Sequence, residues 1–168
     1  QILEAGTWAP NHHHTEPWRF FVLTGEGRKP LGRVMAAVAA EKMDDPESPE
    51  NQARLQNEEA KALRAPVIIA VTAHPAGKPN VVREEEIAAT SAAVQNMLLA
   101  AHGLGLGAVW RTGPAAQHPR TNELFGLEPG EELVGFVYMG YPDMEAPRRH
   151  RASVADKTTW IEADQSYR

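Results

Sequence analysis

Hydrophobic residues follow two patterns along the chain: short continuous apolar stretches, and apolar positions that recur every three or four residues. The stretches at 18–24, 67–73 and 133–139 are rich in β-branched and aromatic residues, which predicts buried strands. The stretches at 67–73 and 133–139 are the most apolar, so they are predicted to be the central strands of a sheet. A shorter strand is predicted at 108–111.

Helical spacing predicts helices at 31–42, 50–63, 83–102 and 119–125, and residues 1–6 have the character of a helix end. The helix at 83–102 is the longest. Apolar residues and alanines surround most of its circumference, so we expect a central, buried helix. Strands and helices without a linker between them predict one α+β or α/β domain over residues 1–168.

Composition narrows the class of protein. A chain of 168 residues with 42% hydrophobic positions is long enough for a core, and no apolar run reaches the roughly 18 residues that cross a bilayer. Seventeen basic against 22 acidic residues give a net charge of −5, which disfavours binding to nucleic acid. The chain has no cysteine, which excludes disulfides, thiolate metal sites and a cysteine nucleophile and fits a reducing cytoplasm.

A glycine-rich segment at 103–107 has the glycine density of a phosphate-binding loop. A dinucleotide fingerprint requires a strand, then the glycines, then a helix. Here the glycines follow a predicted helix and precede a predicted strand. This order predicts a helix C-cap and a tight connection to the strand.

Three consecutive histidines, His12, His13 and His14, leave three interpretations open: a metal site, solvated loop residues, or contacts with an organic cofactor. A zinc site would need further ligands supplied by the fold, and the remaining histidines show no paired spacing. We therefore predict no metal ion.

Three acidic residues, Glu84, Glu85 and Glu86, begin the longest predicted helix. Two of them could act as an acid and base pair. Carboxylates are also favoured in the first turn of any helix, because they complement its dipole, and this is the interpretation we prefer.

Two polar segments are candidate ligand sites. Residues 110–113, WRTG, end a predicted strand, where open sheets bind ligands, and they supply a guanidinium, a hydroxyl and backbone amides. Residues 148–151, RRHR, offer guanidinium groups suited to phosphate, although basic runs are also common on solvated surfaces.

Three blocks taken together resemble the FMN-dependent nitroreductase family, in particular its small single-domain bacterial members. They are APNHHHTEPWRF at 9–20, LGLGAVWRTG at 104–113 and GFVYMGYP at 135–142, in the family's order. The resemblance implies a three-layer α+β sandwich with a mixed, mostly antiparallel sheet flanked by helices. It also implies an intertwined homodimer with FMN at the subunit interface.

The resemblance implies one set of flavin contacts near the N-terminus. Trp8, His12 and His14 fall where the family's proline-containing loop touches flavin. Trp8 departs from the arginine of some relatives, and an indole there would pack on the cofactor.

A second implied set lies towards the C-terminus. Trp110, Arg111 and Thr112 match the strand-end segment that lies against the isoalloxazine ring, and Arg149 and Arg151 match the basic pair that holds the FMN phosphate. The family also has an Arg-Arg-Ser type motif on an N-terminal helix. No such motif precedes Gln1, and we expect that the chain is trimmed and lacks that segment of the native protein.

The implied activity is transfer of hydride from NAD(P)H through flavin N5 to a nitroaromatic or quinone acceptor by a ping-pong mechanism. The flavin carries this chemistry, so no catalytic side chain is predicted. The alternatives are other flavin chemistry on the same fold, such as dehydrogenation or dehalogenation, a flavin-binding protein without catalysis, and a histidine metal module.

Overall fold

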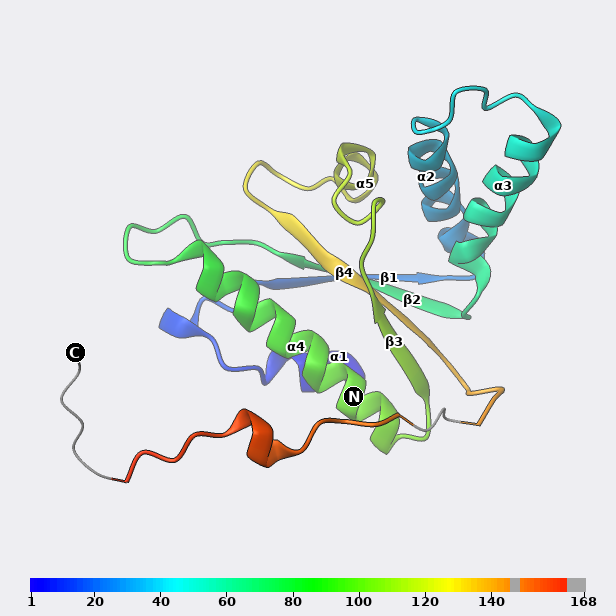
Figure 1. The fold of residues 1–168 in the computed structure, drawn as a ribbon. Helices are drawn as coiled ribbons and strands as arrows, with labels where there is room; N and C mark the ends of the chain where they lie inside the picture. Colours follow the sequence, from blue (N-terminus) through cyan, green and yellow to red (C-terminus); the bar gives the residue numbers. More distant parts are fainter. Residues whose placement is uncertain (146–148, 163–168) are drawn as a thin grey trace.

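A four-stranded sheet forms the centre of the computed structural model, which describes residues 1–145 and 149–162 (Figure 1). The strands are β1 (Trp18–Thr24), β2 (Val67–Ala73), β3 (Gly107–Arg111) and β4 (Glu132–Gly140). Their order is β1-β2-β4-β3, and all three pairings are antiparallel. The two most apolar stretches are therefore the central strands, as predicted.

Helices cover both faces of this sheet, which gives three layers and confirms the α+β class (Figure 1). One face carries α1 (Ile2–Thr7) and α4 (Arg83–Gly103), and the other carries α2 (Lys29–Ala40) and α5 (Pro119–Phe125). Helix α3 (Pro49–Ala60) packs on α2. Short 3-10 turns lie at His12–His14 (η1), Gly25–Arg28 (η2), Lys61–Leu63 (η3) and Val154–Lys157 (η4).

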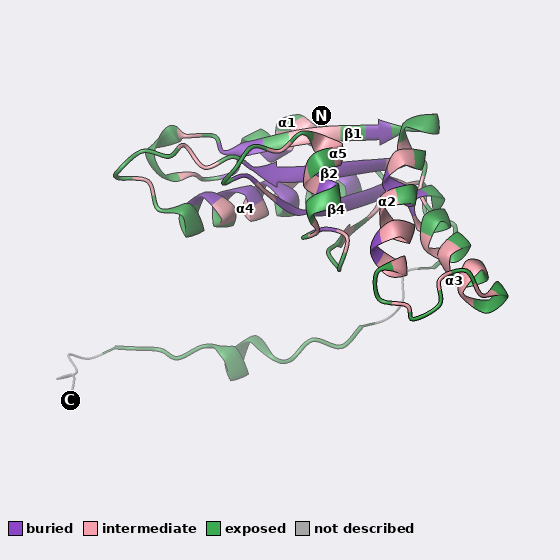
Figure 2. Ribbon diagram, turned by 90° about the horizontal axis from the view of Figure 1, so that it is seen from above, coloured by how far each residue is buried: buried purple, intermediate pink, exposed green. Residues whose placement is uncertain are grey.

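Alternation along the strands separates the core into two halves. In β1, Phe20 packs towards α4, whereas its neighbour Phe21 packs towards α2 and α5. Leu31 of α2 and Met97 of α4 are fully buried on opposite faces, and burial of one such side chain contributes about 1.5–3 kcal/mol. Figure 2 shows the result, with buried strands between partly exposed helices.

Helix α4 is buried on one side only. Val94 and Met97 face the sheet and are fully buried, but Leu99 is 61% exposed, and Ala88 and Gln95 are not fully buried either. The prediction of a helix buried around its circumference is therefore not met within one chain, because a helix on the outer layer of a sandwich contacts the sheet along one stripe.

The C-terminus of α4 confirms the prediction for the glycine-rich segment. Gly105 has a φ of +75°, its N–H donates to His102 O, and Leu106 N donates to Ala101 O. These two bonds form a Schellman motif, which turns the chain into β3. No helix in the described part of the chain is long and apolar enough to cross a membrane.

Candidate functional site

A pocket of about 350 Å³ opens beside the end of β3, on the face of the sheet that α2 and α5 cover. Phe136 and Tyr138 of β4 form its buried floor, and Met35 and Val38 of α2 form an apolar wall. The segment that follows β3, residues 112–116, forms another wall. This volume and this mixture of apolar surface and a few polar groups are typical of sites for small molecules.

The register of the sheet brings Arg111 into this pocket. Arg111 is paired with Phe136 across the β3–β4 ladder, so their side chains lie on the same face of the sheet. The Arg111 guanidinium carbon lies 5.8 Å from the centroid of the Tyr138 ring, within cation–π range. Arg111 and Thr112, both predicted from the sequence to contact a cofactor, line the pocket together.

Tyr138 is an uncharged part of the floor at neutral pH. Burial raises the pKa of its phenol, although the charges of Arg111 and Arg64 partly oppose the effect. The hydroxyl therefore keeps its proton, and it lies 4.0 Å from the Sδ of Met35. Tyr138 therefore adds no negative charge to the pocket at neutral pH.

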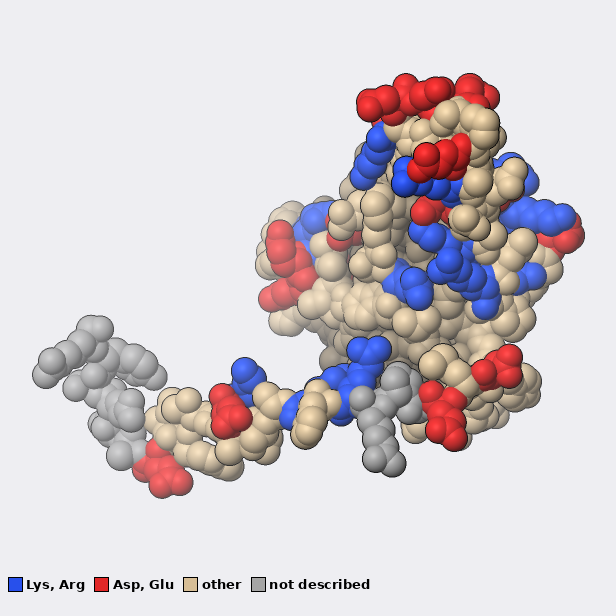
Figure 3. Space-filling view, turned by 45° about the vertical axis from the view of Figure 1, so that its right-hand side comes forward, with Lys and Arg blue, Asp and Glu red and all other residues tan. Residues whose placement is uncertain are grey.

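The other side chains of the pocket make it strongly cationic. Among the described residues, four cations line it, Lys42, Lys61, Arg64 and Arg111, against a single carboxylate, Glu58. Lys61 Nζ lies 2.5 Å from Glu58 Oε1, so this lysine is already paired. The other three cations have no carboxylate within 4.0 Å among residues 1–145 and 149–162. Figure 3 shows Lys and Arg side chains gathered below the acidic tip of the hairpin formed by α2 and α3.

An ion-pair cluster fastens the segment after β3 to α2. Glu41, just past the end of α2, accepts hydrogen bonds from Arg120 Nε at 2.7 Å and His118 Nε2 at 3.0 Å. The hydrogen bond from Arg120, the largest contribution, holds the pKa of Glu41 below its ordinary value, and His118 adds to the effect. The wall that carries Thr112 is thus tied at its far end to the helix that forms the opposite wall.

The Trp110 side chain lies on the other face of the sheet. Its Nε1 donates to Val134 O at 3.3 Å, and the ring packs over Gly135 in the core beneath α4. Successive residues of a strand point to opposite faces, so Trp110 and Arg111 cannot both project into one pocket. Of the three predicted strand-end residues, the structure brings Arg111 and Thr112 to the pocket and assigns the Trp110 indole to the core.

The predicted N-terminal contacts lie away from this pocket. Trp8 caps α1 and is 81% exposed, and His12 and His14 are exposed on η1 next to the start of β1. β1 and β3 are opposite edges of the sheet, three strand spacings or about 14 Å apart. Within one chain these three residues therefore do not meet Arg111. The described residues contain no group of three side chains able to hold a metal ion.

Glu86 is a buried carboxylate that holds the loop around His12–His14 in place. From the sequence, only an interaction with the helix dipole is predicted for it. Glu86 is 1% exposed, and it accepts a hydrogen bond from Thr15 Oγ1 at 2.5 Å and from Ala76 N at 3.3 Å. It thereby joins two loops at the start of α4. His13 and His14 have positive φ values of 58° and 50°, a conformation that non-glycine residues rarely adopt.

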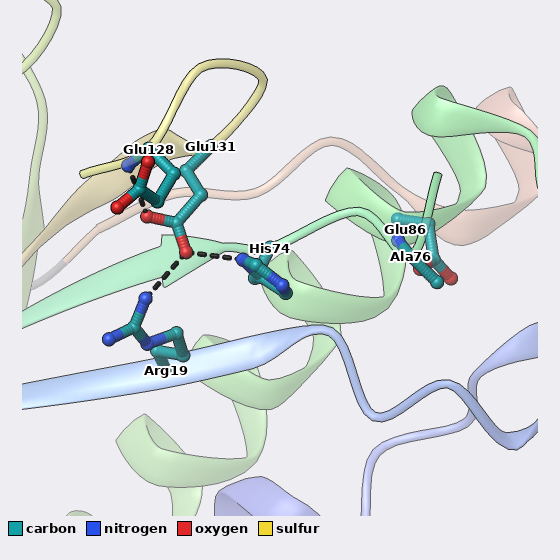
Figure 4. Close-up of polar contacts among 6 residues, drawn as sticks. All are labelled: Arg19, His74, Ala76, Glu86, Glu128 and Glu131. Atoms are coloured by element: carbon teal, nitrogen blue, oxygen red, sulfur yellow. Dashed lines mark hydrogen bonds and ion pairs between the residues drawn. The ribbon is translucent and has the colours of Figure 1, made fainter. Parts of the chain in front are cut away.

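A second buried carboxylate, Glu131, joins three segments at the same end of the sheet (Figure 4). Its Oε1 accepts from Arg19 Nη1 at 2.6 Å and contacts His74 Nδ1, and its Oε2 accepts from Glu128 N at 2.8 Å. Burial alone would raise the pKa of Glu131, but these hydrogen bonds outweigh it and lower the pKa below its ordinary value. The cluster holds β1, β2 and the start of β4 together.

The predicted phosphate contacts lie in the C-terminal segment. Arg149 and Arg151 are exposed, as is every described residue from 149 to 162 (Figure 2). Arg148, the first residue of the basic run, lies outside the described residues. The structure therefore brings neither Arg149 nor Arg151 to the pocket.

Three of the four cations that line the pocket were not predicted from the sequence as site residues. They are Lys42, Lys61 and Arg64, which lie after the ends of α2 and α3. Lys42 and Lys61 fall at the ends of the predicted helices 31–42 and 50–63, and Arg64 follows the second of them. Lys61 and Arg64 are three residues apart, so they lie on one side of the chain just before β2. That spacing was the available signal, but nothing in the sequence indicated that β3 would end opposite it.

Comparisons of the sequence and of the fold with known proteins agree with one another. Residues 1–141 match the family model described as "Nitroreductase family". The Escherichia coli K12 protein named "Putative NAD(P)H nitroreductase YdjA" is 36% identical over 162 residues, which cover 95% of this chain and 83% of that protein. The crystal structure of a nitroreductase-like family protein from Bacillus cereus superposes with a TM-score of 0.79 at 32% identity, covering 96% of this chain and 82% of that one. A "putative nitroreductase in complex with FMN" from Desulfovibrio desulfuricans has a TM-score of 0.65 at 28% identity, covering 97% of this chain and 83% of that one.

Proposed function

We propose that this chain, which belongs to the nitroreductase family, is an FMN-dependent oxidoreductase that uses NAD(P)H to reduce nitroaromatic or quinone acceptors. The observation that carries the proposal is the pocket at the end of β3, where an apolar aromatic floor meets a rim of cations. We further propose that residues 1–168 form one domain and that the cysteine-free protein works in the cytoplasm.

The chemistry of the pocket fits FMN. An isoalloxazine ring is flat and apolar on its faces, and it carries carbonyl oxygens and ring nitrogens that accept hydrogen bonds at its edges. Phe136 and Tyr138 offer apolar surface to such a ring, while Lys61, Arg111 and Thr112 offer donors to its edges. We propose that Arg111, Thr112 and Lys61 hold the ring of the cofactor in this chain. The phosphate contacts of Arg149 and Arg151 are proposed from the family resemblance alone, because these two exposed residues do not line the pocket.

When bound, FMN would supply the redox centre for transfer of hydride from NAD(P)H to the acceptor, which we propose follows a ping-pong sequence. The first two-electron step, from nitro to nitroso, consumes one NAD(P)H and one proton and releases one water. Arg111, which has no ion pair among the described residues, would provide fixed positive charge at this site, and such preorganised charge costs little reorganisation. Tyr138 and Phe136 exclude water from the floor.

A homodimer would complete the site. Trp8, His12 and His14 lie on the opposite edge of the sheet from Arg111, so we propose that they contact the FMN held by the pocket of a partner chain. The outward face of α4 exposes Leu99, and Leu104 follows it at 48% exposure. Two exposed leucines at the C-terminal end of a long helix are suitable contacts for a second copy of the chain.

The absorbance spectrum of the purified protein tests this function. With FMN supplied, we expect a yellow protein whose flavin bands are bleached by NAD(P)H and restored by a nitroaromatic compound or a quinone. Arg111→Gln should weaken FMN binding about tenfold, the effect of losing one charge-assisted hydrogen bond. Arg33→Gln, an exposed arginine of α2 outside the pocket, is the matched control and should bind FMN as the parent does. A protein that takes up no FMN, or holds FMN that NAD(P)H does not reduce, would contradict the proposal.

A further inference from the structure

The histidine loop, residues 11–16, has a strained backbone conformation. His13, His14 and Glu16 have φ values of 58°, 50° and 49°, in the left-handed region that favours glycine. Such residues cost free energy and persist only where the surrounding contacts over-determine the backbone, and they cluster at binding sites and active sites. The conformation of this loop is therefore imposed by specific contacts.

Contacts inside the loop account for part of this conformation. Asn11 Oδ1 accepts a hydrogen bond from Glu16 N at 3.1 Å, which closes the two ends of the loop. The three histidine side chains are exposed, so their burial does not hold the loop in place. Thr15 is half-buried, and its hydroxyl contacts helix α4. This hydroxyl joins the loop to the rest of the chain.

Glu86, in the first turn of α4, is the partner of Thr15. Its Oε1 lies 2.5 Å from Thr15 Oγ1, and its Oε2 accepts from Ala76 N at 3.3 Å (Figure 4). Thr15 Oγ1 also lies 3.3 Å from His12 O, but a hydroxyl has one hydrogen, so we assign that hydrogen to the nearer oxygen of Glu86. One carboxyl group thus connects the histidine loop and the loop after β2 to a long helix.

The burial of Glu86 is costly for a carboxyl group. Its side chain is 1% exposed, whereas Glu84 and Glu85 in the same turn are exposed, so the helix dipole does not require burial. Glu86 has no lysine, arginine or histidine within ion-pair distance in the part of the chain that the structure describes. Buried hydrogen bonds of this kind fix one geometry, because a buried polar group without its partner is unfavourable.

We propose that Glu86 is a positioning residue, which acts through Thr15 to hold the histidine loop in the conformation that meets the cofactor. The inference rests on the proposed function, in which His12 and His14 contact the FMN of a partner chain. A loop that is already in the binding conformation needs no ordering when the ligand binds. When fewer molecules have that conformation, the apparent affinity falls in proportion.

Four variants isolate this contact. Glu86→Met keeps the length of the side chain but removes both acceptor oxygens, and Thr15→Val removes the hydroxyl but keeps the shape. Glu86→Gln is the conservative variant, because its oxygen accepts from Ala76 N while its amide donates to the Thr15 hydroxyl, which can also act as an acceptor. Glu85→Met makes the same change at an exposed residue of the same turn and is the matched control.

Two measurements are made on each protein. Hydrogen exchange is followed by mass spectrometry, on the protein as purified and with saturating FMN, in peptides that cover residues 9–17, 74–78 and 67–73. The first two peptides contain the hydrogen-bonded amides of Glu16 and Ala76, and the third is strand β2 in the core. The dissociation constant for FMN is measured from the recovery of flavin fluorescence on dilution of the loaded protein.

We expect Glu86→Met and Thr15→Val to speed exchange in peptide 9–17 about tenfold and to raise the dissociation constant for FMN about tenfold, the effect of losing one hydrogen bond to a charged group. Glu86→Met should also speed exchange in peptide 74–78, whereas Thr15→Val should not, because it leaves the bond to Ala76 intact. Exchange in β2 should not change. Glu86→Gln should stay within about twofold of the parent, and Glu85→Met should match it.

Unchanged exchange in peptide 9–17 of Thr15→Val would overturn the inference, and so would faster exchange there with an unchanged dissociation constant for FMN. Equal acceleration in β2 of Thr15→Val would also overturn it, because that result indicates a general loss of stability.

The parent protein reports separately on the proposed function. Bound FMN that NAD(P)H does not reduce would contradict the proposed activity, and the variants would still decide the role of Glu86. A parent that takes up no FMN would overturn both proposals.

Discussion

Gly135 of β4 offers a sharp test of how the sheet positions the candidate site. It has a φ of +154°, and a methyl group on its Cα would come within 2.9 Å of Arg111 O and closer still to the Trp110 indole. A positive φ costs a non-glycine residue about 1–2 kcal/mol, and overpacking costs about 1–3 kcal/mol. Gly135→Ala should therefore lower the free energy of unfolding by about 3 kcal/mol.

The measurement is urea-induced unfolding at matched protein concentration, with Gly103→Ala as the control. Gly103 ends α4, has an ordinary helical φ and has no atom within 4 Å of the position of a new methyl group, so alanine there should be neutral or slightly stabilising. Because the strain in Gly135→Ala pushes β3 away from β4, this variant should also bind FMN more weakly, whereas Gly103→Ala should not.

A double variant tests the cause. Trp110→Ala removes the ring that the new methyl group would strike, so the loss in Gly135→Ala/Trp110→Ala should be smaller than the sum of the two single losses. Strict additivity, or a loss below about 1 kcal/mol for Gly135→Ala, would refute the close packing of the indole on this glycine.

Two further predictions concern residues outside the pocket. For Glu131→Gln, the loss in free energy of unfolding relative to the parent should have its full size above the ordinary carboxyl pKa of 4.5 and should shrink as the pH falls further, because a lowered folded-state pKa stabilises only the ionised form. Unfolding measured from about pH 7 to about pH 3 in steps of about one unit tests this expectation. A difference that does not change with pH would contradict it. For Leu99→Glu, on the exposed face of α4, we expect a folded monomer by analytical ultracentrifugation and circular dichroism, and an unchanged dimer would remove this face as the interface.

The strands and helices could be predicted from the sequence because local composition decides them. β1 and β2 begin and end where the apolar runs do, since β-branched residues fit the pleated surface of a buried strand. The end of α4 could be predicted in the same way, because a glycine such as Gly105 is needed where φ is positive. The family could also be predicted from the sequence, because its three blocks of residues lie in order along the chain.

The burial of particular polar residues was not predictable. Glu84, Glu85 and Glu86 are identical in type and adjacent, yet only Glu86 is buried, and its burial depends on Thr15 and Ala76 being brought to it by two other segments. Trp110 and Arg111 are neighbours, and strand alternation alone indicates opposite faces, but which face holds the pocket depends on where α2 and α3 pack.

Local patterns in the chain were enough to establish the elements, the family and the two pocket residues Arg111 and Thr112, because each of these depends on a short segment and its own chemistry. The packing of the whole chain was needed to bring Lys42, Lys61 and Arg64 around the same space as Tyr138, and to place the histidine loop on the far edge of the sheet. Strand order and helix packing join residues that are distant along the chain, and no local pattern encodes which of them will meet.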